Sequence, residues 1–164
     1  MTAYDDNDYG YEDEHRVDRA YRIIAAPVAV VYAALTDARM VANWLPPEGA
    51  TGTMEAFDPQ PGGAIRMTLR FASGEGGKTT ADTDVVSGRF VELDPNECVV
   101  QEFDFVSDDP AFAGTMRMTW GLTWCAEGTE ISVVAENVPS GISKEDHAVG
   151  LASSLANLAA YIEQ

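Results

Sequence analysis

Hydrophobic and polar positions change their period along the chain, from a strand and short helical stretches to a run of strands and then a final helix. The segment VDRAYRII has the β-branched and aromatic composition of a strand and stops at Ala25-Ala26-Pro27. Proline suits the first turn of a helix, and apolar residues recur at helical spacing through PVAVVYAALTD. ARMVANWL predicts a second short helix, which Pro46-Pro47 ends.

Turn signals alternate with strand-like segments through the middle of the chain. Six segments predict strands: TGTMEAFD, AIRMTLRF, TDVVSGRFVELD, CVVQEFDFVS, TMRMTWGLTWC and GTEISVVAEN. The alternation is clearest in TMRMTWGLTWC, where one face is apolar. That face carries Met116, Met118, Trp120, Leu122 and Trp124. Gly88, inside a strand pattern, predicts a bulge and a bend in the sheet.

An uninterrupted helix is predicted from Ser143 to Glu163, with Ser143 as its cap and Asp146 in its first turn. Its apolar stripe is Ala148, Leu151, Ala152, Leu155, Leu158, Ala159 and Ile162. Small residues are frequent in this helix: Ala148, Gly150, Ala152, Ser153, Ser154, Ala156, Ala159 and Ala160. A helix that covers a curved sheet normally carries large side chains, so these small residues predict a cavity beneath it.

The order of these elements predicts one α+β domain over residues 17–164. A strongly bent antiparallel sheet around the long helix, with the two short helices closing one end, buries every apolar face in a single core. Residues 1–16 are predicted to form a disordered acidic tail, because the first fourteen contain six acidic residues and three Tyr without aliphatic periodicity.

Composition excludes several classes of partner. The net charge of -17, with only ten Lys and Arg, argues against nucleic acid and anionic lipid surfaces. No apolar run is long enough to span a bilayer, and the acidic N-terminus is unlike a secretory signal, so we expect a cytoplasmic protein that does not bind membranes. Cys98 and Cys125 lack metal-type spacing and are expected to be small buried hydrophobes. Neither a metal nor a cofactor is predicted.

Several segments together carry a family resemblance: AAPVAVVYAALTDARMVANWLPPEG, PGGAIRMTL, GKTTADTDVVSGRFVELDP and the stretch from AFAGTMRMTWGLTW to the end. From Val17 to Gln164 the chain resembles the SRPBCC superfamily, and within it the group similar to the C-terminal domain of the heat-shock-protein-90 ATPase activator. The resemblance implies a START-like, birch-pollen-allergen-like helix-grip fold of about six to seven strands. Where the family often has Arg before Pro-Gly-Gly, this chain has Gln60.

The resemblance also implies binding of an apolar or amphiphilic small molecule between the helix and the sheet. The residues predicted to line such a cavity are Tyr32, Trp44, Met67, Leu69, Gln101, Phe103, Met118, Trp120, Leu151 and Leu155. Gln101 alternates with Val99, Phe103 and Phe105, so this amide points inward and is the favoured polar contact for a ligand. Trp44 and Trp120 are equally natural as core residues, and the Tyr32 hydroxyl can simply reach solvent.

For the ionisable residues the sequence favours a structural or solvent-exposed role over a catalytic one. His147 can help to orient a ligand, but as a general base it needs a partner that the sequence does not place. Asp82 with Asp84, and Glu102 with Asp104, are expected on the solvated outer face of the sheet.

Three functions from different classes are therefore open. The first is a binding module for a small hydrophobic molecule, the second a polyketide cyclase-like enzyme, and the third a chaperone-activator-like interaction module that uses an apolar patch or the acidic tail. Some relatives are polyketide cyclases, but the same fold also serves transport and sequestration. A homodimer is a further expectation.

Overall fold

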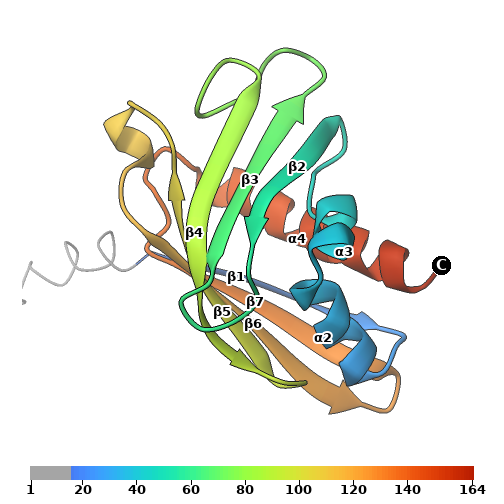
Figure 1. Ribbon diagram of the computed structural model, residues 1–164. Coiled ribbons are helices and arrows are strands. Elements are labelled where there is room, and N and C mark those ends of the chain that lie inside the picture. The colour runs from blue at the N-terminus through green and yellow to red at the C-terminus, as the bar shows by residue number, and fades with distance from the viewer. Residues whose placement is uncertain (1–15) are drawn as a thin grey trace, which may run out of the picture.

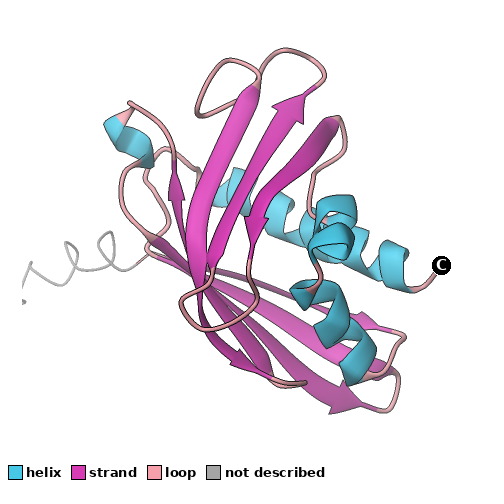
Figure 2. Cartoon of the chain, in the orientation of Figure 1, coloured by secondary structure: helices cyan, strands magenta, loops and turns pink. Residues whose placement is uncertain are grey.

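A computed structural model describes residues 16–164, and apart from Arg16 the predicted acidic tail lies outside them. Figure 1 shows a curled sheet that wraps around the C-terminal helix, with the two short helices beside it. Figure 2 shows the same view by secondary structure, and the sheet makes up most of the fold. The predicted α+β helix-grip architecture is confirmed.

The sheet has seven antiparallel strands in the order β1-β7-β6-β5-β4-β3-β2. The strands are β1 Val17–Ile24, β2 Ala50–Phe57, β3 Ala64–Phe71, β4 Thr83–Asp94, β5 Cys98–Phe105, β6 Met116–Cys125 and β7 Gly128–Glu136. The helices are α2 Val28–Thr36, α3 Ala38–Trp44 and α4 Lys144–Ile162, with a 3-10 turn at Pro110–Phe112. β1 and β2 are the two edges, and β1 pairs with β7 along its whole length.

Local sequence signals set the ends of the helices. Pro27 is the N-cap of α2 and so precedes its first turn. The Asp37 carboxylate caps α3 by accepting hydrogen bonds from the backbone N–H groups of Arg39 and Met40. Ser143 caps α4 as predicted, because its hydroxyl accepts from the backbone N–H of Asp146.

Two irregularities bend the sheet, and neither is at Gly88. The register shifts between Met54 and Ala56 of β2 and between Phe90 and Glu92 of β4. Gly88 pairs regularly with Phe103, so the predicted bulge at this glycine was wrong. A Cβ at Gly88 would lie 1.9 Å from the backbone oxygen of Glu102, which shows that the glycine permits a close approach of two backbones.

The core lies between the inner face of the sheet and a leucine stripe on α4. Leu151, Leu155 and Leu158 are buried, and inward residues of β7 such as Ile131 and Val133 meet the same core. The predicted reason for a cavity was wrong for most of the eight small residues: only Ala159 is buried, and Ala148, Gly150, Ala152 and Ala160 are exposed. The three leucines recur at helical spacing, which turns these small residues away from the sheet.

The prediction that Trp124 lies on the buried apolar face of its strand was wrong. It is 75% exposed, whereas Trp120 of the same strand is buried. β6 runs past the first residue of β5, since Cys98 pairs with Gly121 and no residue of β5 lies beside Trp124. The end of β6 has therefore left the core.

A charged cluster connects β1 to α4 across the inner side of the edge strand. Asp18 is buried in β1 and accepts a hydrogen bond from Arg16 at 2.7 Å. His147 Nδ1 of α4 lies 2.7 Å from the same Asp18 oxygen, and Arg16 also donates to the backbone oxygen of Ile142. Burial by itself raises the pKa of Asp18, but hydrogen bonds from Arg16 and His147 outweigh it and lower the pKa below its usual value.

The outward orientation of small residues on α4 predicts a stabilising substitution. Gly150 lies inside the helix, and no atom lies within 4 Å of a Cβ built on it. Gly150→Ala should therefore raise the free energy of unfolding by about 1 kcal/mol, because alanine costs less backbone entropy in a helix. Leu155→Ala on the buried stripe should lower it by about 2–5 kcal/mol. Urea denaturation measures both, and a destabilising Gly150→Ala would contradict the orientation of α4.

The lowered pKa of Asp18 predicts a pH-dependent contribution to stability. Because the folded pKa lies below the unfolded value, the contribution is present above about pH 4 and is lost as the pH falls through the folded pKa. Asp18→Asn should lower the free energy of unfolding by about 1–3 kcal/mol at neutral pH.

Denaturation at neutral pH and at about pH 3 measures this dependence. The difference between the wild type and Asp18→Asn should shrink on acidification. Asp108→Asn is the matched control, because Asp108 is exposed and should affect neither measurement. An equal difference at both pH values would show that the carboxylate charge does not act as described.

Candidate functional site

Two of the hollows on the surface of the described residues flank α4: one lies at its end, and the other lies between its first turns and the edge strand β1. One, of about 540 Å³, is an apolar groove between α2, α3 and the end of α4, and includes Val30, Met40 and Tyr161. The other, of about 360 Å³, lies between β1 and the start of α4 and includes Asp18, Lys144 and Ala148. The lining of the first hollow is mainly apolar, and Val30 in it is 46% exposed.

Six of the residues predicted to line a cavity are buried in the core: Trp44, Met67, Met118, Trp120, Leu151 and Leu155. Trp44 donates its indole N–H to the backbone oxygen of Ala34 at 2.9 Å. Its ring meets the edge of Trp120, with centroids 5.7 Å apart. These contacts place the two tryptophans where they stabilise the junction of α3 with the sheet.

Gln101 is the polar group that the sheet turns into this apolar interior. It lies on the inner face of β5, is 8% exposed, and pairs with Phe90 and Met118 on the neighbouring strands. Its side-chain oxygen accepts a hydrogen bond from the indole N–H of Trp120 at 3.0 Å. Every fully buried side-chain nitrogen or oxygen in residues 16–164 has a partner. The Gln101 amide nitrogen has none there, so it borders accessible space.

Part-buried apolar residues continue from Gln101 toward the tips of the strands. Phe103 and Phe105 follow it at alternate positions of β5 and pack against the core, and Leu69 of β3 is also half-buried. Leu69 pairs with Asp84 of β4. Along β5 the inner face therefore changes from the buried side chain of Gln101 to part-exposed residues near the strand tips. We call this part-exposed end, at Leu69 and Phe105, the rim.

Asp84 lies at this rim, so the prediction that it lies on the solvated outer face was wrong. Its side chain is 5% exposed, because Lys78 from the β3–β4 loop donates both its backbone N–H and its ammonium group to the carboxylate. The Lys78 nitrogen lies 2.8 Å from Asp84 Oδ2. Glu102 does face outward, where it pairs with Arg89 and Arg117. Strand alternation alone could not reveal a partner supplied by a loop.

Among the described residues, neither His147 nor Tyr32 forms a hydrogen bond with Gln101. His147 has the orienting partner that the sequence did not place, since Asp18 holds its Nδ1 atom. The two residues are 129 positions apart in the sequence, which leaves no local signal for this pair. Burial, with the charge of Asp94 nearby, raises the pKa of the Tyr32 phenol.

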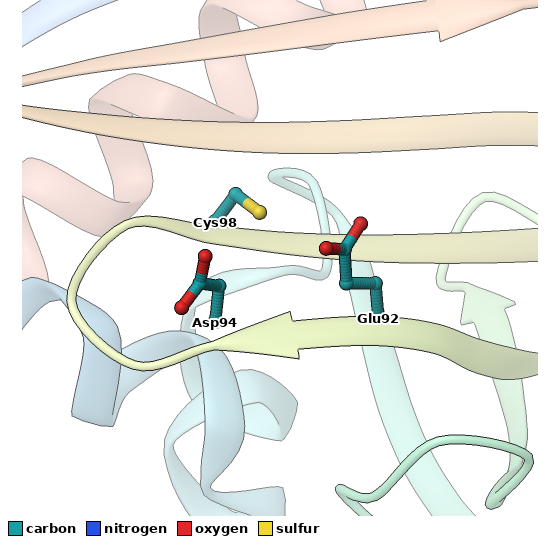
Figure 3. Close-up of side chains that lie close together, drawn as sticks. All are labelled: Glu92, Asp94 and Cys98. Atoms are coloured by element: carbon teal, nitrogen blue, oxygen red, sulfur yellow. The ribbon is translucent and has the colours of Figure 1, made fainter.

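A further cluster of polar side chains lies across the β4–β5 hairpin, where Figure 3 shows Glu92, Asp94 and Cys98 close together. One ligand atom from each lies within 4.8 Å of the others, and both carboxylates are exposed. Burial and the carboxylates of Glu92 and Asp94 raise the pKa of the Cys98 thiol, which disfavours the thiolate that binds metals. The tight turn after Asp94 was a signal for this proximity. Cys98 and Cys125 are half-buried, not fully buried as predicted.

Among residues 16–164, no helix combines the length and the hydrophobicity that crossing a bilayer requires.

Solved structures share this fold. A Chromobacterium violaceum protein is 32% identical, with a TM-score of 0.81, and the match covers 90% of this chain and 97% of that protein. The AHSA1 protein from Silicibacter pomeroyi is 19% identical, with a TM-score of 0.74 and coverage of 90% and 97%. DynU16, from the dynemicin biosynthetic locus, is 24% identical with a TM-score of 0.66; the match covers 90% of this chain and 47% of DynU16.

No curated protein matches the chain. The family described as Activator of Hsp90 ATPase homolog 1-like protein matches residues 25–163, from the end of β1 to the end of α4. This match and the 32% identity over nearly the full length of the Chromobacterium protein agree with the fold and with the resemblance in the sequence. The chain belongs to the Activator of Hsp90 ATPase homolog 1-like family.

Proposed function

We propose that the protein binds a small, largely apolar molecule against the inner face of β3, β4 and β5. The observation that carries the proposal is Gln101, an amide more than nine-tenths buried whose nitrogen has no partner among residues 16–164. This N–H borders accessible space, and a typical hydrogen bond contributes about 0.5–1.5 kcal/mol, so a ligand oxygen that accepts from it gains a specific contact.

The ligand site lies toward the strand tips and not beneath the middle of α4. Leu151, Leu155 and Leu158 fill the interior there. Leu69, Phe103 and Phe105 remain part-exposed, so an apolar molecule can cover them. Burial of apolar surface at about 25 cal/mol per Å² supplies the affinity, while Gln101 fixes the orientation.

Removing the Gln101 amide should weaken ligands that carry an acceptor oxygen. Gln101→Leu should lower their affinity by about tenfold, the equivalent of one hydrogen bond, and leave purely apolar probes nearly unaffected. A panel of hydrophobic probes, measured by thermal shift and calorimetry, tests this. Gln60→Leu is the matched control, because Gln60 lies in the exposed β2–β3 turn.

Two results would count against the binding proposal. One is the absence of any bound molecule in native mass spectra, together with no thermal shift from any probe. The other is binding of acceptor-bearing probes with equal affinity to the wild type and to Gln101→Leu.

A cyclase-like activity is the second candidate, and the Asp18–His147 pair favours it. A carboxylate on Nδ1 fixes the imidazole tautomer and leaves Nε2 as the group that can take up a proton. The His147 Nε2 atom has no partner among the described residues and is not fully buried, so a substrate can reach it. The likeness to DynU16, from a biosynthetic locus, is consistent with such an activity.

The catalytic candidate predicts a loss of turnover in His147→Gln. Replacing an acid or base typically lowers turnover by about 100-fold or more, and the measurement is conversion of polyketide-like substrates by the purified protein. Asp18→Asn should retain part of the activity, because the imidazole remains but loses its orienting partner. Unchanged turnover in His147→Gln, or no turnover by the wild type, would exclude this role.

A further inference from the structure

The loop between β3 and β4 places one of the chain's two lysines, Lys78, at the rim of the inner face. The loop folds back on itself: the backbone N–H of Gly77 donates to Ala81, and those of Thr79 and Thr80 donate to Thr83. A Cβ at Gly77 would lie 2.1 Å from the backbone oxygen of Thr80, so the fold of the loop depends on glycine at this position. The position of Lys78 is therefore set by the loop backbone.

The ammonium group of Lys78 has one carboxylate partner and an aromatic neighbour. It donates to Asp84 at 2.8 Å and lies 5.3 Å from the centre of the Phe105 ring. The Lys78 side chain is 24% exposed, whereas the Asp84 side chain behind it is 5% exposed. An ammonium group has three N–H donors, and Asp84 accepts from Nζ through one oxygen, so donors remain for another molecule.

Two hydrogen-bond donors thus lie at the two ends of one apolar strip on β5, which consists of Phe103 and Phe105. The Gln101 amide nitrogen is the deep donor and the Lys78 ammonium group is the donor at the rim. Gln101, Phe103 and Phe105 alternate along β5, and four residues of a strand span about 14 Å. A molecule that fits this strip carries acceptor oxygens along or at the ends of an apolar chain.

The charge balance decides whether the oxygen at the rim is charged. The carboxylate of Asp84 already neutralises Lys78, so the pair has no net charge to offer an anion. The whole chain has a net charge of -17, which repels anionic ligands. An amine has no acceptor for the Lys78 donors. An uncharged carbonyl or ester oxygen accepts a hydrogen bond from Lys78 and adds no charge.

Building on the proposed binding function, we infer that Lys78, held by Asp84, anchors the uncharged carbonyl end of an amphiphilic ligand whose chain runs along Phe105 and Phe103 toward Gln101. The structure thus points to ketone- or ester-bearing apolar chains, and not to fatty acids or amines, as the ligand class.

Calorimetry with three probes of similar chain length tests this inference. They are methyl nonyl ketone, decanoate and decylamine, titrated into the full chain at neutral pH and moderate salt. The ketone should bind at least about tenfold more tightly than decanoate or decylamine, since only the ketone accepts a hydrogen bond without adding charge. Tighter binding of decanoate, or equal binding of all three, would overturn the inference and leave the binding function standing.

The double variant Lys78→Met/Asp84→Asn tests the residues themselves. The Asp84→Asn change keeps a side-chain oxygen for the backbone N–H of residue 78, so the loop retains this bond, and thermal unfolding checks that the fold is intact. The variant should bind the ketone about tenfold more weakly, which is the loss of a hydrogen bond from a charged donor. Lys144→Met is the matched control, because Lys144 lies at the start of α4 in the hollow beside β1 and not at the rim.

The outcomes separate this inference from the proposed function. If the double variant keeps the full ketone affinity and Gln101→Leu reduces it, the rim anchor is wrong and the deep contact stands. If no probe binds the wild type, both the anchor and the binding function are excluded.

Discussion

Burial of the leucine stripe of α4 in the curve of the sheet is the interaction on which the rest of the structure depends. Each buried leucine contributes about 1.5–3 kcal/mol relative to an exposed one. The sheet can reach around the helix because β2 and β4 each carry a bulge. The same burial fixes the rotation of α4, and therefore which of its residues meet the sheet and which meet solvent.

The rotation of α4 also determines where a ligand can bind. The leucines fill the space under the helix, and Trp44 and Trp120 fill the end near α3. The inner face that remains part-exposed lies toward the tips of β3, β4 and β5, where polar groups are brought in by one strand residue and by one loop. Gln101 and Lys78 are thus functional candidates because of what the leucines leave uncovered.

The period of hydrophobic residues was enough to predict the elements, their order and the inward direction of Gln101. It failed where a residue's surroundings come from elsewhere in the chain. Trp124 follows the alternation but lies past the end of its neighbouring strand. Asp84 has a charge pattern typical of a solvated face, yet Lys78 from the loop pairs with it. The Asp18–His147 contact joins distant parts of the sequence, which periodicity cannot relate.

The pairing of β1 with β7 has a consequence for synthesis of the protein. Val17 pairs with Glu136, so the first strand has no partner until nearly the whole sheet has left the ribosome. At usual rates of translation this delay is on the order of ten seconds. During it, the unpaired backbone of this strand-forming segment and Ile24, which is buried once the protein has folded, are open to other nascent chains. The charges of Asp18, Arg19 and Arg22 interrupt that segment, and so protect it from aggregation while it waits.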